Sequence, residues 1–427
     1  MPAMQSATGM PKAASPRAAN RFEALDGWRG VCACFVVLFH FHGYSPIYTS
    51  PLVRHSWLFV DFFFVLSGFV IAWNYADRLS TGPEVRRFMV LRLGRVYPLH
   101  LFMLACFVAY EGARWASGTA NGAAPFTGEM RPWAAVSNLF LLQGLHVHDS
   151  LTWNGPAWSI STEAWTYAIF ALVCAAAGLR GWMLAAAAIV PPAVLYGVST
   201  TGMDVTYDWG LVRCVFGFAL GVACCQFVRH RPPLLRGSGT AGATAIELVV
   251  VAAVVLFVSA TGHAATSILA PFVFAVAVLV FASEQGWVSR LFRTRLFNWL
   301  GQLSYSIYLT HFLFVLVLPV VLKRVLHQDL WSWMPVAGGD PVWVYGRNAV
   351  EGTLFYGVVV ALTLGFSALT YRWVETPGRE WSRRWAKRVG GEPIRATTHG
   401  LNGPSIAAPA RDIADAKSFS TPTIRRA

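Results

Sequence analysis

The 427-residue sequence has few charged residues, since Asp, Glu, Lys and Arg together make up only 13% of it. Ordinary soluble domains contain about 25% charged and roughly 45–50% apolar residues. This chain is 55% apolar, with a mean hydropathy of +0.48. The composition excludes a soluble protein of any number of domains and indicates an integral membrane protein.

Cysteine is also scarce, and its spacing excludes the usual cysteine frameworks. The seven Cys residues all lie in apolar stretches, with no C-x-x-C pair and no spacing typical of metal ligands. We therefore expect buried reduced thiols, no disulfide framework and no metal site. An apolar signal-peptide core is missing as well, so residues 1–20 are predicted to form a disordered cytosolic tail. Residues 379–427 are predicted to form a second tail, basic and largely disordered.

Apolar spans, in contrast, follow one another along most of the chain. Most approach the roughly 20 residues that cross a membrane as a helix. They predict an all-α integral membrane protein with about ten transmembrane helices. A further apolar stretch, 133–145, is too short to span comfortably and is predicted to be re-entrant or interfacial. The ten spans lie near 30–45, 57–75, 97–116, 158–178, 182–200, 209–228, 245–262, 264–283, 303–322 and 353–374.

Basic residues gather in alternate loops. Clusters follow the second, sixth, eighth and tenth spans, whereas the loops between them hold few. By the positive-inside rule, both termini are cytosolic. The formal net charge of +13 therefore indicates topology and contact with anionic lipid headgroups, and no nucleic-acid partner. The loop 323–351 is the exception, because its basic residues would face outward, although acidic residues accompany them.

Arg29 and His40 lie at the two ends of the first span. An ionisable group inside a span is costly, about 2.5–3.5 kcal/mol for Arg, Lys or Asp at the helix centre, so each needs a reason. At 100° per residue, Arg29 and His40 return to nearly one face, roughly 16 Å apart along the axis. A cation at the cytosolic mouth and an imidazole deep in the bundle would share one wall. Alternatively, His40 is a packing residue bonded to a backbone carbonyl.

Two spans carry a polar stripe on an otherwise apolar helix, and each stripe is predicted to face the bundle interior or a water-filled cavity. In the fourth span, three roles stay open for Glu163: general acid or base, partner of a histidine or arginine, or structural ion pair. In the ninth span, hydrogen bonding between helices is favoured. The fourth span's stripe is Ser159, Thr162, Glu163 and Thr166, and the ninth span's is Ser304, Tyr308 and His311.

Asp61 lies near the outer end of the second span, at about the depth that His40 reaches on the first. A His40–Asp61 pair would fix the tautomer of the imidazole and raise its basicity. The alternative is an interfacial carboxylate that extends outward to the headgroups.

Arg92 and Arg95 lie three residues apart on one helical face, immediately before Pro98. Because proline favours the first turn of a helix, we expect the next helix to begin there. Guanidinium groups and free N–H groups both bind anions, so this helix start would form a phosphate site. The alternative is a positive-inside signal, which we accept for Arg86 and Arg87.

In this order, the segments resemble the acyltransferase 3 family, multi-spanning transacylases of the O-antigen and peptidoglycan O-acetyltransferase type. The resemblance covers about 21–377. It rests on seven motifs in family order: LDGWRG, the Arg29-x10-His40 spacing, VDFFFVLSGF, RLGRVYPLH, WSISTEAWTY, LGQLSYSIYLTH and YRWVETP.

This resemblance implies a membrane domain at 21–378, in the bacterial inner membrane. It implies transfer of an acyl group, usually acetyl, from cytosolic acetyl-CoA or another acyl-CoA. The acceptor would be a hydroxyl of a carbohydrate or other small molecule. The family's arginine and histidine correspond to Arg29 and His40, and its arginine pair to Arg92 and Arg95.

The predicted donor-binding residues are therefore Arg29, Arg92 and Arg95. His40 is predicted to be a general base on the acceptor hydroxyl, a role worth ~10²–10⁴ in rate. A covalent acyl-histidine is the rival route. Glu163 and Asp61 complete the predicted catalytic set, either orienting the histidine or binding acceptor hydroxyls.

Two other classes of protein remain possible on the sequence alone. One is a transporter or exporter of a small anion or glycan precursor, with polar stripes along its path and a helix broken at Pro191-Pro192. Against it, the two halves show no inverted-repeat symmetry, and a nucleotide donor explains the paired arginines better. The other is a structural scaffold, which leaves the buried ionisable groups unexplained.

Overall fold

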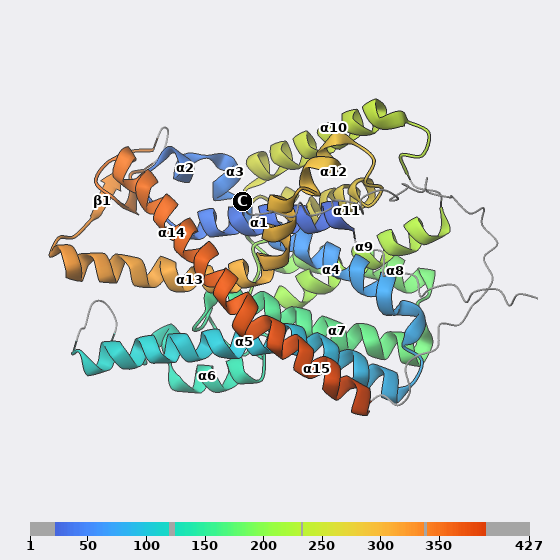
Figure 1. The fold of residues 1–427 in the computed structure, drawn as a ribbon, viewed down its shortest axis with the longest axis horizontal. Coiled ribbons are helices and arrows are strands. Elements are labelled where there is room, and N and C mark those ends of the chain that lie inside the picture. The colour runs from blue at the N-terminus through green and yellow to red at the C-terminus, as the bar shows by residue number, and fades with distance from the viewer. Residues whose placement is uncertain (1–21, 119–123, 232–233, 337–339, 390–427) are drawn as a thin grey trace, which may run out of the picture. The chain divides into compact units, whose positions relative to one another are not determined.

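The computed structural model describes residues 22–118, 124–231, 234–336 and 340–389. The tail predicted at 1–20, and residues 390–427 of the tail predicted at 379–427, lie outside the described residues. Ten helices overlap the ten predicted spans, one each, and run roughly alongside one another (Figure 1). They are α1 (Glu23–His40), α4 (Phe59–Tyr75), α5 (Gly82–Ala116), α7 (Trp158–Ala177), α8 (Gly181–Val198), α9 (Gly210–His230), α10 (Gly239–Thr261), α11 (Ala270–Phe281), α13 (Arg295–Leu326) and α14 (Ala349–Thr370).

Eight helices among the described residues are long and apolar enough to cross a membrane. The protein is therefore an all-α multi-pass membrane protein. Two predicted spans fall outside the eight for physical reasons: α1 carries Glu23, Asp26 and Arg29 in its first two turns, and the apolar helix at Ala265–Phe281 is short. The number of ten spans and the cytosolic position of both termini remain predictions.

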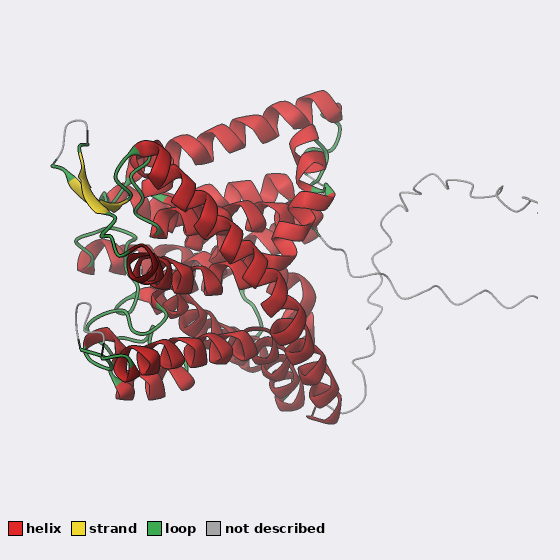
Figure 2. Ribbon diagram, turned by 60° about the vertical axis from the view of Figure 1, so that its left-hand side comes forward, coloured by secondary structure: helices red, strands yellow, loops and turns green. Residues whose placement is uncertain are grey.

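Shorter elements connect the long helices. Strands β1 (Trp331–Met334) and β2 (Val342–Tyr345) form an antiparallel hairpin in which Trp331 pairs with Tyr345. Figure 2 shows this hairpin and several connecting loops together at one end of the helices. The other short elements are α2 (Pro46–Thr49), α3 (Pro51–Arg54), η1 (Ser56–Leu58), η2 (Ala76–Arg78), η3 (Gly128–Met130), α6 (Pro132–Leu139), η4 (Gly155–Ala157), η5 (Ala265–Leu269), α12 (Trp287–Phe292), the π-turn η6 (Tyr371–Glu375) and α15 (Thr376–Val389).

Two of the three Lys and Arg residues in the exceptional loop, 323–351, pair with acidic residues of the same loop. Lys323 lies 2.9 Å from Asp329, and Arg347 lies 2.7 Å from Glu351. These ion pairs offset the charge that would otherwise oppose an outward position of this loop.

Glycines allow two pairs of helices to approach closely. In the α4–α9 pair, a Cβ atom on Gly68 would lie 1.9 Å from the Phe218 carbonyl oxygen, and one on Gly221 would lie 1.9 Å from that of Val65. In the α1–α13 pair, a Cβ on Gly301 would lie 2.2 Å from the Asp26 carbonyl oxygen. Small residues at such crossings are the usual means of close packing in membranes. The second crossing also sets the position of Arg29 on α1.

We expect Gly221→Ala to destabilise the protein, because the obstructing atom is backbone and the helices must separate. Overpacking of this kind costs about 1–3 kcal/mol or more. Gly365→Ala is the matched control, since no atom lies within 4 Å of a Cβ there. Thermal unfolding of the two purified variants tests this. Equal midpoints would contradict the packing described for α4 and α9.

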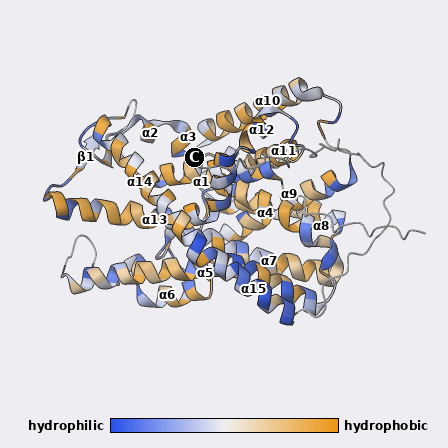
Figure 3. Ribbon diagram, in the orientation of Figure 1, coloured by the Kyte–Doolittle hydropathy of each residue, from blue (hydrophilic) through white to orange (hydrophobic). Residues whose placement is uncertain are grey.

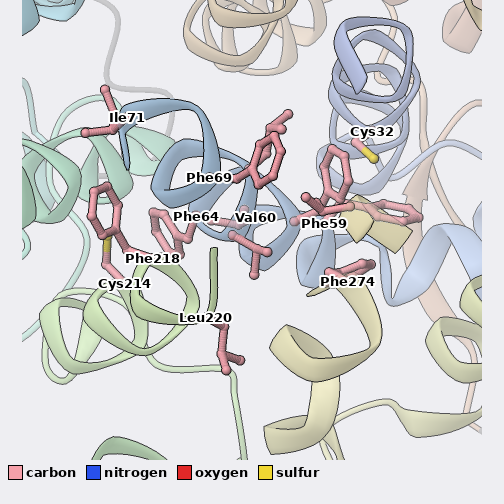
Figure 4. Packing of buried hydrophobic residues seen from close by; sticks show 14 of the residues in the cluster. Cys32, Phe59, Val60, Phe64, Phe69, Ile71, Cys214, Phe218, Leu220 and Phe274 are labelled. Atoms are coloured by element: carbon pink, nitrogen blue, oxygen red, sulfur yellow. The ribbon is translucent and has the colours of Figure 1, made fainter. Parts of the chain in front are cut away.

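The core between α4, α9 and α11 is aromatic. Figure 4 shows Phe64, Phe218 and Phe274 among its buried side chains, with Cys214 near Phe218 and Cys32 on the neighbouring helix α1. All seven cysteines are free thiols, five of them buried and two partly buried.

Helix α5 corrects the prediction that a helix begins at Pro98. It begins at Gly82, where Glu84 accepts hydrogen bonds from the backbone N–H groups of Ser80 (2.9 Å) and Thr81 (3.0 Å) in a capping box. Pro98 therefore lies inside the helix. Arg92 and Arg95 cannot share an anion with free helix-terminal N–H groups, because none are exposed there.

The structure also tests two further predictions, one about a helix that contains two prolines and one about a short apolar stretch. Helix α8 continues through Pro191 and Pro192, so the predicted break is wrong. The apolar stretch 133–145 forms only the eight-residue helix α6 and turns, consistent with its failure to span the membrane.

Helix α15 occupies the first part of the segment predicted as a tail, 379–427. Its small residues Ser382 and Ala386 are buried, and it packs along α5, where a Cβ on Gly94 would lie 2.0 Å from that of Ser382. Figure 3 shows α15 as hydrophilic beside the largely hydrophobic spans. The basic tail therefore starts as an ordered helix.

Candidate active site

An inner cavity of about 160 Å³ lies between α1, α4, α5, α7 and α13, towards the end of the bundle where α1 begins. It brings together Arg29 from α1, Arg92 and Arg95 from α5, and Glu163 from α7. Its volume is below the roughly 300–1,000 Å³ of a site that encloses a whole drug-sized ligand. The inner cavity therefore has room for one end of a long anionic ligand.

The arginines of the inner cavity differ in how far they are engaged. Arg29 donates to Asp26 Oδ1 (3.1 Å), the Gly301 carbonyl (3.3 Å) and Ser304 Oγ (2.8 Å). Arg92 donates one bond to the Tyr75 hydroxyl (3.1 Å), while its buried Nε has no partner among the described residues. The side chains on α5 thus keep donor capacity for an anion, whereas Arg29 is fixed in place.

Glu163 lies in the wall of the inner cavity with one oxygen already bound. Its Oε1 accepts from Ser67 (2.6 Å) and from Tyr167, whose hydroxyl also contacts Ser67 (3.0 Å). The structure gives Oε2 no hydrogen-bond partner within the described ranges. Glu163 therefore sits in a polar network away from His40. A partnership of Glu163 with a histidine, one form of its second predicted role, therefore has no support in these contacts.

His40 lines a second, outer cavity of about 280 Å³, near the other end of α1. Its Nδ1 lies 2.9 Å from the Val36 carbonyl oxygen, one turn back on the same helix. This contact matches the carbonyl bond that was the alternative for His40. A carbonyl can only accept, so Nδ1 carries the proton and Nε2 keeps its lone pair. The described residues provide no hydrogen-bond partner for Nε2.

A second histidine faces His40. The His311 ring centroid lies 4.8 Å from that of His40, and its Nδ1 lies 3.2 Å from the Ile307 carbonyl oxygen. The polar stripe of α13 is buried as predicted, with Ser304 bound to Arg29 and Tyr308 to Ser159. The predicted hydrogen bonding between helices is confirmed.

The expected His40–Asp61 pair does not form, and Asp61 does not extend outward. Asp61 is fully buried, and its two oxygens accept from Arg213 Nε (2.9 Å) and Nη2 (2.7 Å). The guanidinium also donates to the Val205 carbonyl (3.1 Å) and lies over Trp57 and Trp158. Asp61 is thus half of a buried ion pair. It does not orient His40.

The two cavities share two wall residues, Val60 and Tyr308. The Tyr308 hydroxyl donates to the Pro156 carbonyl (3.0 Å) and accepts from Ser159 Oγ (2.9 Å), which holds the ring in place. Val60 and Tyr308, hereafter the partition, therefore lie between the inner cavity, with its three arginines, and the outer cavity, with His40.

Comparison with known proteins decides the family. Residues 22–372 match the family model Acyl_transf_3, described as an acyltransferase domain. The chain belongs to this acyltransferase family. The resemblance predicted from the motifs is therefore confirmed, and the protein is a membrane acyltransferase.

Relatives are found in several bacteria. Protein 2 of the picA locus of Rhizobium radiobacter is 34% identical over 36% of this chain and 82% of its own length. Acyltransferase MdmB of Streptomyces mycarofaciens is 28% identical over 69% and 79%. BcsY of Komagataeibacter xylinus, provisionally named a membrane-bound transacylase, is 26% identical over 86% and 85%. No solved structure matches the chain significantly.

Several residues of the two cavities were missed from the sequence. Arg213 carried a signal, because an arginine inside an apolar span requires a partner. Trp57 and Trp158 carried none, since tryptophan is common in membrane helices and their interfaces. Among the residues that the structure describes, no group of three or more His, Cys, Asp or Glu side chains is placed to hold a metal ion.

Proposed function

We propose that this membrane acyltransferase transfers an acetyl or other acyl group from cytosolic acyl-CoA to a hydroxyl of a carbohydrate or other small acceptor. One observation carries the proposal: arginines from two distant helices line one cavity, and His40 with a free Nε2 lines the next, across the partition.

Acyl-CoA would bind with its extended, thioester-bearing arm inserted into the helix bundle. The coenzyme is a polyanion, so Arg29, Arg92 and Arg95 would hold its phosphate-bearing end by charge-assisted hydrogen bonds. Glu163 is the single carboxylate among the described residues of the inner cavity wall, so the wall keeps a net positive charge. When bound, the donor supplies an activated carbonyl carbon.

His40 would be the general base. The hydroxyl oxygen of the acceptor forms the new ester bond as the thioester C–S bond breaks, and the hydroxyl proton passes through Nε2 to the departing thiolate. The Val36 carbonyl would stabilise the imidazolium through Nδ1–H, the part that Asp61 was expected to play. Attack by Nε2 itself, giving an acyl-histidine, uses the same free lone pair.

We expect Arg92→Gln and Arg95→Gln to weaken acetyl-CoA binding about tenfold or more, because a hydrogen bond to a charged group contributes about 1.5–3 kcal/mol. Arg86→Gln is the matched control: Arg86 is exposed on the same helix and outside the cavity. Calorimetric titration of purified protein with acetyl-CoA gives the affinities. An affinity that Arg92→Gln and Arg95→Gln leave unchanged would assign both residues to topology alone.

A further inference from the structure

The outer cavity differs from the inner one in the sign of its charge. Its wall contains two carboxylates, Glu129 and Asp204, and one arginine, Arg213. Both guanidinium contacts to Asp61 are short, so the charge of Arg213 is already neutralised by a residue behind the wall. In the inner wall Arg29 is likewise paired with Asp26 (3.1 Å), which leaves Arg92 and Arg95 against the single carboxylate of Glu163. The two cavities are therefore complementary to ligands of opposite charge.

The carboxylates of the outer cavity are accessible. Glu129 lies in η3 on an exposed part of the chain, and its carboxylate has no partner within the described ranges. Asp204 is partly exposed, and its Oδ2 lies 3.2 Å from Nδ1 of His263. Both side chains can accept hydrogen bonds from a ligand without giving up a buried ion pair.

Three tryptophans also contribute to the wall of the outer cavity. Trp57, Trp153 and Trp158 all line the outer cavity and are 2–5% exposed. Trp153 has a backbone φ of +54°, a conformation that is unfavourable for a bulky residue. Its backbone N–H donates to the Glu129 carbonyl (3.3 Å) and its indole N–H to that of Arg131 (3.3 Å). The loop thus holds this indole at the cavity against a conformational cost.

We infer that the outer cavity is the acceptor site, and that it selects a glycoside without an anionic group near the modified hydroxyl. The inference rests on the proposed function. The Arg213 guanidinium covers Trp57 and Trp158, so Trp153 is the indole that would contact the apolar face of a ring with hydroxyl edges. Hydroxyl or ammonium groups donate to Glu129 and Asp204, and one hydroxyl lies within reach of His40 Nε2. A carboxylate or phosphate on the ring is repelled.

The test uses two photoreactive probes and the purified full-length protein. One is methyl glucoside bearing a small diazirine, and the other is the matching glucuronide, with a carboxylate in place of the exocyclic CH2OH. After irradiation, mass spectrometry locates the labelled peptides. We expect the glucoside probe to label the segments around Trp153 and Asp204, in competition with excess methyl glucoside. The glucuronide should label them at least about tenfold less.

The double variant Glu129→Gln/Asp204→Asn should bring the two probes to within about threefold of each other, while acetyl-CoA binding shows that it is folded. Asp329→Asn is the matched control, because its carboxylate is exposed but outside the cavity. Equal labelling by both probes in the wild type, no labelling at the outer cavity, or an unchanged ratio in the double variant would each overturn the inference.

The outcome separates this inference from the proposed reaction. Labelling of the outer cavity by a protein that never releases CoA from acetyl-CoA would support the glycoside site and contradict the acyl transfer. Release of CoA with no labelling of the outer cavity would contradict the glycoside site and leave the transfer standing.

Discussion

Replacement of His40 by Gln is expected to lower acyl transfer by ~10²–10⁴ while acetyl-CoA binding stays unchanged. Glutamine fills a similar volume and can still donate to the Val36 carbonyl, but it has no lone pair that accepts a proton near neutral pH. The proposed donor-binding arginines, Arg29, Arg92 and Arg95, lie in the inner cavity, on the other side of the partition. The loss should therefore appear in the rate of the chemical step, measured as CoA release under saturating donor.

His42→Gln is the matched control for this substitution. His42 is the next histidine on the chain, is exposed, and is outside the outer cavity wall. It should retain wild-type transfer. If His40→Gln keeps full activity, or if both variants lose the same share, His40 is a packing residue and the base lies elsewhere.

Asp61→Asn is expected to destabilise the protein by about 3–5 kcal/mol, because it leaves the charge of Arg213 buried and uncompensated. Both side chains are at most 1% exposed, and the bonds that join them measure 2.7 and 2.9 Å. The double replacement Asp61→Leu/Arg213→Met removes both charges and should recover most of that loss. Thermal unfolding in one detergent, followed by a thiol-reactive dye, compares the wild type, Asp61→Asn, the double variant and its two single variants, Asp61→Leu and Arg213→Met.

Coupling between the two positions is the decisive quantity. A structural ion pair predicts a double variant more stable than either single variant. Additive losses, or a wild-type midpoint for Asp61→Asn, would show that the pair contributes nothing to stability.

The sequence predicted the place of a side chain well where the spacing along a single helix decides which face it occupies. Arg29 and His40 lie on the same helix, so their placement on α1 followed from the helical repeat. The polar faces of α7 and α13 followed in the same way. For the α7 stripe, three of four members are at most 4% exposed. The face of a helix on which a residue lies depends on that helix alone, whichever helices pack against it.

Contacts between helices were harder to predict. Asp61 was assigned to His40 because the two lie at similar depth, but depth gives no information on which helix packs beside which. Glycines at Gly68 and Gly221 bring α9 against α4, and α9 carries Arg213. An arginine satisfies a buried carboxylate better than a neutral imidazole, because it supplies a full charge and a bidentate geometry.

The division into two cavities was also beyond the sequence. The outer wall takes Trp153 and Asp204 from different loops, and no periodicity relates loop residues to one another. The partition depends on Tyr308, which the stripe on α13 placed correctly, but its second member, Val60, carries no polar signal. For donor and acceptor to meet at His40, the thioester would have to pass this partition.

The most direct test of the central claim follows a radiolabelled acetyl group from acetyl-CoA, using purified wild-type protein in lipid vesicles with a cell-envelope sugar fraction. The account predicts label in the sugar fraction and free CoA in equal amount, both dependent on His40. Label that crosses the vesicle membrane with the acetyl-CoA thioester intact would identify a transporter and contradict the account.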